Sequence, residues 1–253
     1  MNRLFFSLAL ICAGLALGYS LQLLDRRGVT KLPMEIAAFR KLLQKVGLLF
    51  FMPISFAGAV WVVSFSDIRV ALLPFIGLMA LITGGILGIA LARLLGAPSK
   101  QTGVLFCCGS FTNIGAIGGL VCFMFLGEAG FALVALYKMF EEIAYYTVGF
   151  PIAKFYSGTG KKNESFLTRI LTILQDPFVI AVLSSFMIGL SLNLLGVERP
   201  YLFQLATAVS IPAGTFILIV SIGLGMHFSS LAKHMKECLG ISFIKFLAVP
   251  ACT

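Results

Sequence analysis

Runs of about 20 consecutive apolar residues recur along the whole chain, and they constrain its fold more than any other feature. A helix of that length crosses about 30 Å of hydrocarbon. Of the 253 residues, 59% are hydrophobic and only 11% are charged, whereas a soluble domain carries roughly 25% charged residues. The sequence therefore predicts an all-α integral membrane protein with the lipid bilayer as its surroundings.

We expect eight membrane segments, at residues 4–24, 44–65, 70–92, 103–126, 129–153, 171–194, 203–228 and 239–253. The first is followed directly by Asp25-Arg26-Arg27 without a clear small-residue cleavage site, so we interpret it as a retained helix rather than a signal peptide. The last is too short to cross a bilayer comfortably. This predicts a chain truncated within its eighth helix.

The basic residues of the loops predict the orientation of these segments. Fourteen of them fall in one set of alternating loops: Arg26, Arg27, Lys31, Arg40, Lys41, Lys45, Arg93, Lys100, Lys154, Lys161, Lys162, Arg169, Lys233 and Lys236. Three fall in the other set, with the N-terminus: Arg3, Arg69 and Arg199. Because Lys and Arg mark the cytoplasmic side, we expect an outside N-terminus and a cytoplasmic linker over 157–170, in a plasma membrane of the bacterial inner-membrane kind.

The two halves of the chain share a short sequence at an offset of 171 residues. Gly18-Tyr19-Ser20-Leu21-Gln22-Leu23-Leu24 matches Gly189-Leu190-Ser191-Leu192-Asn193-Leu194-Leu195 at five of seven positions. Pro53 and Pro212 also lie in corresponding helices, where we expect helix breaks or hinges. Chance similarity between Leu-rich helices is the alternative. A true repeat would comprise five helices, and an odd number inverts the second copy in the membrane. The predicted division is then 1–156, the linker 157–170, and the start of an incomplete inverted repeat over 171–253.

The segment 103–126 has a polar, glycine-rich centre that reads Gly109-Ser110-Phe111-Thr112-Asn113-Ile114-Gly115-Ala116-Ile117-Gly118-Gly119. Glycine costs a helix about 1 kcal/mol relative to alanine, so a continuous helix is disfavoured here. Close helix packing through small residues is one interpretation. The other is an unwound crossover, broken over Gly115–Gly119, whose following half-helix points free N–H groups at an anion. The candidate solute-binding residues are Ser110, Thr112, Asn113, Gly115, Gly118 and Gly119.

The next segment, 129–153, carries charges at membrane depth. On a continuous helix Glu142 lies about 40° from Lys138, and Glu141 lies about 60° to the other side, with Tyr145 between them. An ion in hydrocarbon costs about 2.5–3.5 kcal/mol on insertion scales, so these side chains must face protein or water. A structural Lys–Glu pair and a proton or cation coupling site are both open interpretations.

Several of these stretches together resemble the auxin efflux carrier family, within the superfamily of bile-acid, arsenite and riboflavin-type transporters. The resemblance rests on Thr112-Asn113-Ile114-Gly115-Ala116-Ile117-Gly118, Phe125-Leu126-Gly127-Glu128-Ala129-Gly130, Ala135-Leu136-Tyr137, Asp176-Pro177-Phe178-Val179-Ile180-Ala181, Ile211-Pro212 and Ile222-Gly223-Leu224. It implies ten helices in two inverted repeats, with crossovers in the fourth and ninth helices. It also implies export or exchange of carboxylates.

The chain departs from this family's pattern at three places. Leu120 stands where the family usually has Pro, Asp176 where it has Asn, and Glu141-Glu142 where amides are more common. The second crossover would lie beyond the end of the chain.

The expected function is that of a secondary transporter for a small organic anion, working by alternating access around the crossover. A sodium-coupled symporter of the bile-acid type and a non-transporting membrane receptor or scaffold are the alternatives. Proton or sodium coupling and a homodimer stay open. The six cysteines and two histidines show no metal-ligand spacing, so we expect no enzyme, cofactor or metal. The net charge of +9 sits in short loops rather than on one face, which does not indicate a nucleic-acid partner.

Overall fold

The computed structural model describes residues 2–29, 34–64, 67–158, 175–228 and 232–253. Among these residues there are helices and no strands. The elements are α1 (Asn2–Arg26), α2 (Ile36–Val46), η1 (Gly47–Phe51), α3 (Met52–Val62), α4 (Ile68–Leu94), α5 (Ser99–Ser110), η2 (Ile114–Gly118), α6 (Gly119–Tyr137), α7 (Glu141–Ala144), η3 (Tyr145–Gly149), α8 (Phe150–Ser157), α10 (Pro177–Leu194), α11 (Tyr201–Gly223), η5 (Ala232–His234), α12 (Met235–Phe243), η6 (Ile244–Ala248) and α13 (Val249–Cys252).

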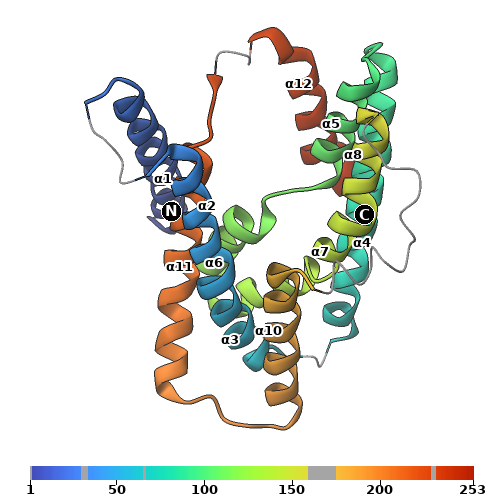
Figure 1. Ribbon diagram of the computed structural model, residues 1–253. Coiled ribbons are helices and arrows are strands. Elements are labelled where there is room, and N and C mark those ends of the chain that lie inside the picture. Colours follow the sequence, from blue (N-terminus) through green and yellow to red (C-terminus); the bar gives the residue numbers. More distant parts are fainter. Residues whose placement is uncertain (1, 30–33, 65–66, 159–174, 229–231) are drawn as a thin grey trace. The chain divides into compact units, whose positions relative to one another are not determined.

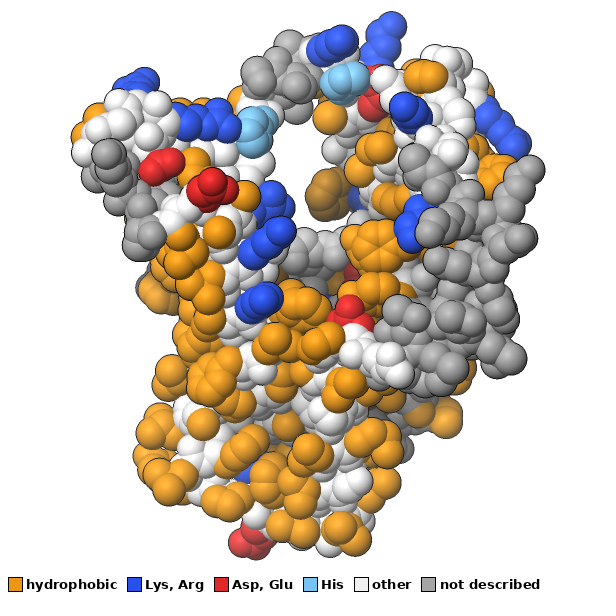
Figure 2. Space-filling view, in the orientation of Figure 1, with side chains coloured by type: hydrophobic (Ala, Val, Ile, Leu, Met, Phe, Trp, Pro, Cys, Tyr) orange, Lys and Arg blue, Asp and Glu red, His pale blue; other side chains and the backbone are white. Residues whose placement is uncertain are grey.

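Six helical stretches are long and apolar enough to cross a membrane: Phe5–Arg26, Ile36–Val62, Ile68–Leu94, Ser99–Tyr137, Pro177–Leu194 and Tyr201–Gly223. Large hydrophobic side chains lie exposed along them, as lipid-facing side chains would, and Figure 2 shows such side chains over much of the visible surface. The prediction of an all-α, multi-pass membrane protein is confirmed. Most of the predicted 157–170 linker lies outside the described residues.

The chain divides into two compact units that are not consecutive in sequence. The first comprises residues 1–66, 113–135 and 180–226, and the second comprises 67–112, 136–179 and 227–253. Each unit has its own buried apolar cluster, around Ile11, Leu120 and Ile219 in the first and around Ala80, Ile244 and Val249 in the second. Each unit contains residues from both predicted repeats, so the units do not coincide with the division of the sequence at 156 and 171. That division stays a prediction.

The two prolines predicted to break helices do not do so. Pro212 lies inside the continuous helix α11, and Pro53 lies at the start of α3, which continues η1 without interruption. Proline lacks the N–H that bonds the carbonyl four residues back, and its ring clashes with that carbonyl. Before Pro53 the helix widens into the π-helical turn η1, in which the Met52 N–H bonds the Gly47 carbonyl five residues back. The widened turn absorbs the proline without a break.

The same arrangement occurs twice more. The π-helical turns η3 and η6 end two residues before Pro151 and Pro250, as η1 ends two residues before Pro53. A widened turn rotates the residues it contains relative to an ideal helix. Tyr145 and Lys245 lie in η3 and η6, so these prolines influence where two polar side chains of the membrane segments point.

Two residues that correspond in the predicted repeat make similar contacts in the first unit. Gln22 of α1 donates from its side-chain amide to the carbonyl of Leu224, at the C-terminal end of α11. Asn193, its counterpart in the repeat, donates in the same way to the carbonyls of Val60, Trp61 and Val63, at the C-terminal end of α3. A side chain of α1 thus caps the end of α11, and the corresponding side chain of α10 caps the end of α3. Two copies related by a two-fold axis would exchange contacts in this way.

The matching glycines of the repeat behave alike. A Cβ on Gly18 would overlap the Val220 carbonyl oxygen on α11, and one on Gly189 would overlap the Ala57 carbonyl oxygen on α3. Each glycine lets two helix backbones approach closely, which is a common packing device in membranes. The prolines do not follow this register. The two close-contact carbonyls, of Val220 and Ala57, are 163 residues apart in the sequence, whereas Pro212 and Pro53 are 159 residues apart. The offsets differ by about one helical turn, so the two prolines do not occupy corresponding positions.

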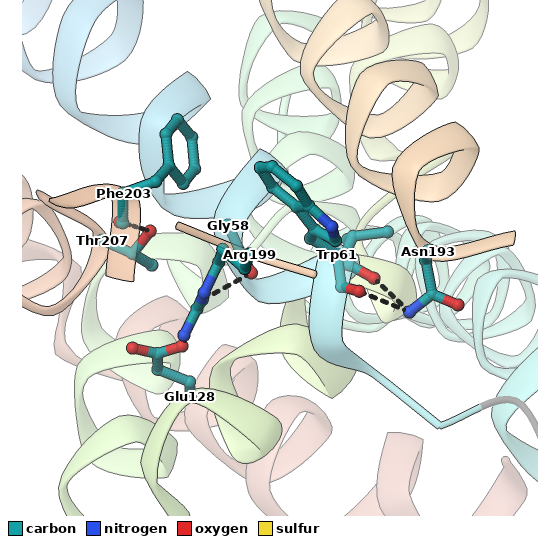
Figure 3. A network of polar contacts seen from close by, with 8 residues as sticks. Gly58, Trp61, Glu128, Asn193, Arg199, Phe203 and Thr207 are labelled. Carbon is teal, nitrogen blue, oxygen red and sulfur yellow. Dashed lines mark hydrogen bonds and ion pairs between the residues drawn. The ribbon is translucent and has the colours of Figure 1, made fainter. Parts of the chain in front are cut away.

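A polar network joins loops that the alternation of segments predicts on one side of the membrane (Figure 3). Arg199, after α10, contacts the Glu128 carboxylate at 2.6 Å and the Gly58 carbonyl at 2.9 Å. The Trp61 indole N–H donates to the carbonyl of Val197 at 2.8 Å. In the second unit, Ser99 likewise donates to Tyr156, and both lie in loops predicted on the opposite side.

Replacing Asn193 with leucine should lower the free energy of unfolding by about 1–3 kcal/mol, because it strands carbonyls at the end of α3. Thermal unfolding of the purified protein in detergent measures the change. Ser191→Ala is the matched control, since Ser191 is exposed on the same helix, and it should leave stability within about 0.5 kcal/mol. Equal stability of Asn193→Leu and the parent protein would contradict the capping role.

Candidate functional site

The fourth predicted segment is broken at residues 111–113. α5 ends at Ser110, Phe111 is extended with φ −86° and ψ 146°, and Asn113 has φ −93° and ψ 43° before η2 begins. The extended stretch is visible between α5 and η2 in Figure 1. The predicted break is confirmed, but its position was wrong. Gly115 to Gly119 are helical, and the interruption precedes them.

The glycines after the break serve packing. A Cβ on Gly119 would press on the Phe131 ring, and one on Gly118 would press on Ile114. Gly115 is buried. Leu120, where the resembled family has proline, is fully buried against Ile11 and Ile219. These residues fix the start of the second half-helix in the core of the first unit.

Asn113 stands at the N-terminal end of that half-helix. Its carbonyl accepts the first helical hydrogen bond, from the Ile117 N–H at 3.0 Å. The N–H groups of residues 114–116 therefore lie in the first turn, before the helical hydrogen bonds begin. Such groups carry the positive end of the helix dipole. The Asn113 side chain is exposed and does not cap the turn. An exposed amide donor therefore lies beside the positive end of a helix that continues through η2 into α6.

The C-terminal end of α5 lies in the second unit, and its polar groups are held by neighbouring helices. The Ser110 hydroxyl donates to the Leu81 carbonyl of α4 at 2.6 Å. The Lys245 ammonium of η6 donates to the Ser110 carbonyl at 2.9 Å. Gly84 and Gly109 face each other so closely that a Cβ on either would overlap the other's carbonyl oxygen. Ser110 was a solute-binding candidate, but its hydroxyl is engaged in joining α5 to α4.

An aromatic cluster holds the first residue of the break. The Phe111 ring packs edge to face against Tyr145, with centroids 4.4 Å apart, and Tyr145 packs in turn on Phe150 at 4.7 Å. A Cβ on Gly149 would overlap the Phe111 ring, so glycine makes room for it. Thr112, the next residue, is exposed. Phe111 is thus anchored to the fifth segment while the chain beyond it crosses to the first unit.

The fifth segment is itself interrupted, which corrects the prediction of one continuous charged face. α6 has a kink at Gly127, where φ is 67°, and it ends at Tyr137. Residues 138–140 form a turn before α7. The Lys138–Glu141 pair nevertheless forms, with 3.8 Å between the ammonium and the carboxylate and 12% and 10% of the two side chains exposed. The Glu142 side chain lies outside the described part of the structure.

Asp176, a departure from the resembled family, caps a helix. Its carboxylate accepts from the Phe178 N–H at 2.9 Å and from the Tyr146 hydroxyl at 3.2 Å. Pro177 follows as the first residue of α10, where its missing N–H costs nothing. An asparagine oxygen would accept the same backbone bond, so this departure leaves the start of the helix unchanged.

Two functional features were missed in the sequence. Lys245 lies inside the apolar segment 239–253, where an ionisable residue alone signals function. The Arg199–Glu128 pair joins two loops distant in sequence, and no local pattern predicts it. Within the described ranges, no three His, Cys, Asp or Glu side chains lie close enough to hold a metal ion.

Glu141→Gln should lower the free energy of unfolding by about 3–5 kcal/mol, because it removes the negative charge 3.8 Å from the Lys138 ammonium in a largely buried place. Adding Lys138→Met should restore much of the loss. The exposed Asp67–Arg69 pair, 56% and 88% exposed, is the control, and Asp67→Asn should cost less than about 1 kcal/mol. Chemical or thermal unfolding in detergent compares them. A Glu141→Gln protein no less stable than Asp67→Asn would show that the pair is not structural.

Comparison with family models, with curated proteins and with solved structures finds no match to this chain. The resemblance to auxin efflux carriers therefore rests on its motif residues alone.

Proposed function

We propose that the chain is a secondary carrier for a small organic anion such as a carboxylate, which binds at the N-terminal end of the half-helix that begins at Asn113. Alternating access around the crossover would move the solute across the membrane. The observation that carries the proposal is the break itself. Non-helical backbone at membrane depth is tolerated only where it is buried in protein or lines a water-filled cavity, and here the exposed Thr112 and Asn113 lie within it.

The polarity of that half-helix favours an anion. Helix N-termini bind carboxylates and phosphates through free N–H groups and the positive end of the dipole. Carriers with discontinuous membrane helices direct such ends at anionic solutes. The Asn113 amide adds a neutral donor, which strengthens binding without a permanent charge that would hinder release. The motif resemblance to auxin efflux carriers points to the same class of solute.

Asn113→Ala should weaken binding of the transported carboxylate by about 1–3 kcal/mol, or roughly tenfold to a hundredfold, because it removes one hydrogen bond to a charged group. Calorimetric titration of the purified full-length protein with a panel of mono- and dicarboxylates measures the affinity. Asn113→Asp keeps the shape but adds a negative charge, so it should weaken binding further. Thermal stability should change little in either variant.

The capping residue Asn193 provides the matched control. Asn193→Leu should lower stability and leave the affinity unchanged, which is the reverse of the Asn113 result. Normal carboxylate affinity in a destabilised Asn113→Ala protein would identify Asn113 as a packing residue. Tighter binding of cations by Asn113→Asp, with no effect on carboxylates, would assign the opposite polarity to the site.

A further inference from the structure

Lys245 places a positive charge within the apolar segment 239–253, which was predicted to enter the membrane, and its ammonium lies at the C-terminal end of α5. It lies in η6, the π-helical turn that precedes Pro250, and its ammonium donates to the Ser110 carbonyl at 2.9 Å. Lys245 is a part-buried donor in this contact. A charge in an apolar segment is costly to insert into a membrane, so it needs compensating partners.

The partner is the negative end of α5. The last carbonyls of a helix have no intrahelical donor and carry about half a negative charge together. In α5 the Phe111 N–H bonds the Cys107 carbonyl, and the Ser110 carbonyl at the very end receives Lys245 instead. The ammonium thus satisfies an orphan acceptor and opposes the dipole of the half-helix in one contact.

A carboxylate also acts on this ammonium through space. Glu141 lies near enough to Lys245 to interact with it electrostatically, as does the Cys108 thiol. Glu141 is also paired with Lys138. The charged groups described around the end of α5 are therefore two ammonium groups and the Glu141 carboxylate, together with the carbonyl oxygen of Ser110.

We propose that Lys245 is a tethered cation at the C-terminal end of α5. Its ammonium takes the place of the metal cation that other carriers with broken helices bind at such an end. In such carriers, half-helix C-terminal ends and unwound carbonyls coordinate sodium. Here the Ser110 carbonyl supplies an oxygen atom of the same kind, and the Lys245 ammonium occupies it. The protein therefore needs no sodium at this position. Removing the lysine opens a latent site for a small monovalent cation.

The test compares the stability of the full chain in sodium chloride and in choline chloride, because choline is too large for the site. The wild-type Tm should be the same in both salts. Lys245→Ala should have a lower Tm in choline chloride and a saturable rise of about 4–8 °C with added sodium, the size expected when a ligand binds the folded state well above its dissociation constant.

Two further variants separate charge from space. Lys245→Met keeps the stem but not the charge, so it should be destabilised and insensitive to sodium. Lys236→Ala, an exposed lysine on the preceding helix α12, should behave like wild type. A wild-type protein whose Tm rises with sodium would overturn the proposal without any variant being needed. A Lys245→Ala protein equally destabilised in both salts, or a Lys245→Met protein as stable as wild type, would also overturn it.

The inference extends the proposed function, since it concerns the ion requirement of the same broken segment, but its readout needs no solute. Sodium rescue of Lys245→Ala in a protein that binds no carboxylate would keep the tethered cation and reject the carrier. Carboxylate binding without any sodium effect on Lys245→Ala would keep the carrier and reject the tethered cation.

Discussion

A helix that breaks at membrane depth leaves carbonyl and N–H groups that lipid cannot satisfy, so protein groups or a water-filled cavity must satisfy them. The break at residues 111–113 creates two such ends of opposite polarity. At the negative end, Lys245 reaches the Ser110 carbonyl from a distant segment. At the positive end the structure leaves an exposed amide, Asn113. That asymmetry is the basis for proposing an anionic solute at the second end.

Three prolines in the described part of the chain lie where they affect helix register. Three of the prolines follow π-helical turns, and two of those turns carry Tyr145 and Lys245. A widened turn re-aims side chains while the helix continues, so a covalent feature of the backbone positions an aromatic ring against Phe111 and an ammonium against Ser110. Glycine has the complementary role, since Gly84 and Gly109 bring the backbones of α4 and α5 into contact beside the break.

The sequence allowed prediction of the features that depend on local composition. Six of the eight predicted segments correspond to stretches long and apolar enough to cross a membrane, whereas 129–153 and 239–253 have no such stretch of their own. The polar glycine-rich centre of 103–126 indicated a break. Its position was misjudged because glycine tolerates helix when its missing side chain makes room for a neighbour, as Gly119 does for Phe131. Pro53 was predicted as a hinge because the π-helical turn that precedes it has no sequence signature. Pro212 was predicted as a hinge but lies inside the continuous helix α11.

Contacts between residues far apart in the sequence could not be predicted. Lys245 and Ser110 are 135 residues apart, and Arg199 and Glu128 are 71 apart. Gln22 and Asn193, the amide residues of the predicted repeat, make similar capping contacts, which the sequence did not predict.

The central claim is that water and solute reach the break in the fourth segment. Alkylation of Thr112→Cys by a water-soluble maleimide, in a full-length background with the native cysteines replaced, tests it directly. Thr112 is exposed in the break, whereas Val104, 60% exposed on α5, would face lipid and serves as the control position. The account predicts that Thr112→Cys reacts, that a bound carboxylate slows the reaction, and that Val104→Cys does not react. A Thr112→Cys protein that is as unreactive as Val104→Cys, or that reacts equally fast at saturating solute, would contradict it.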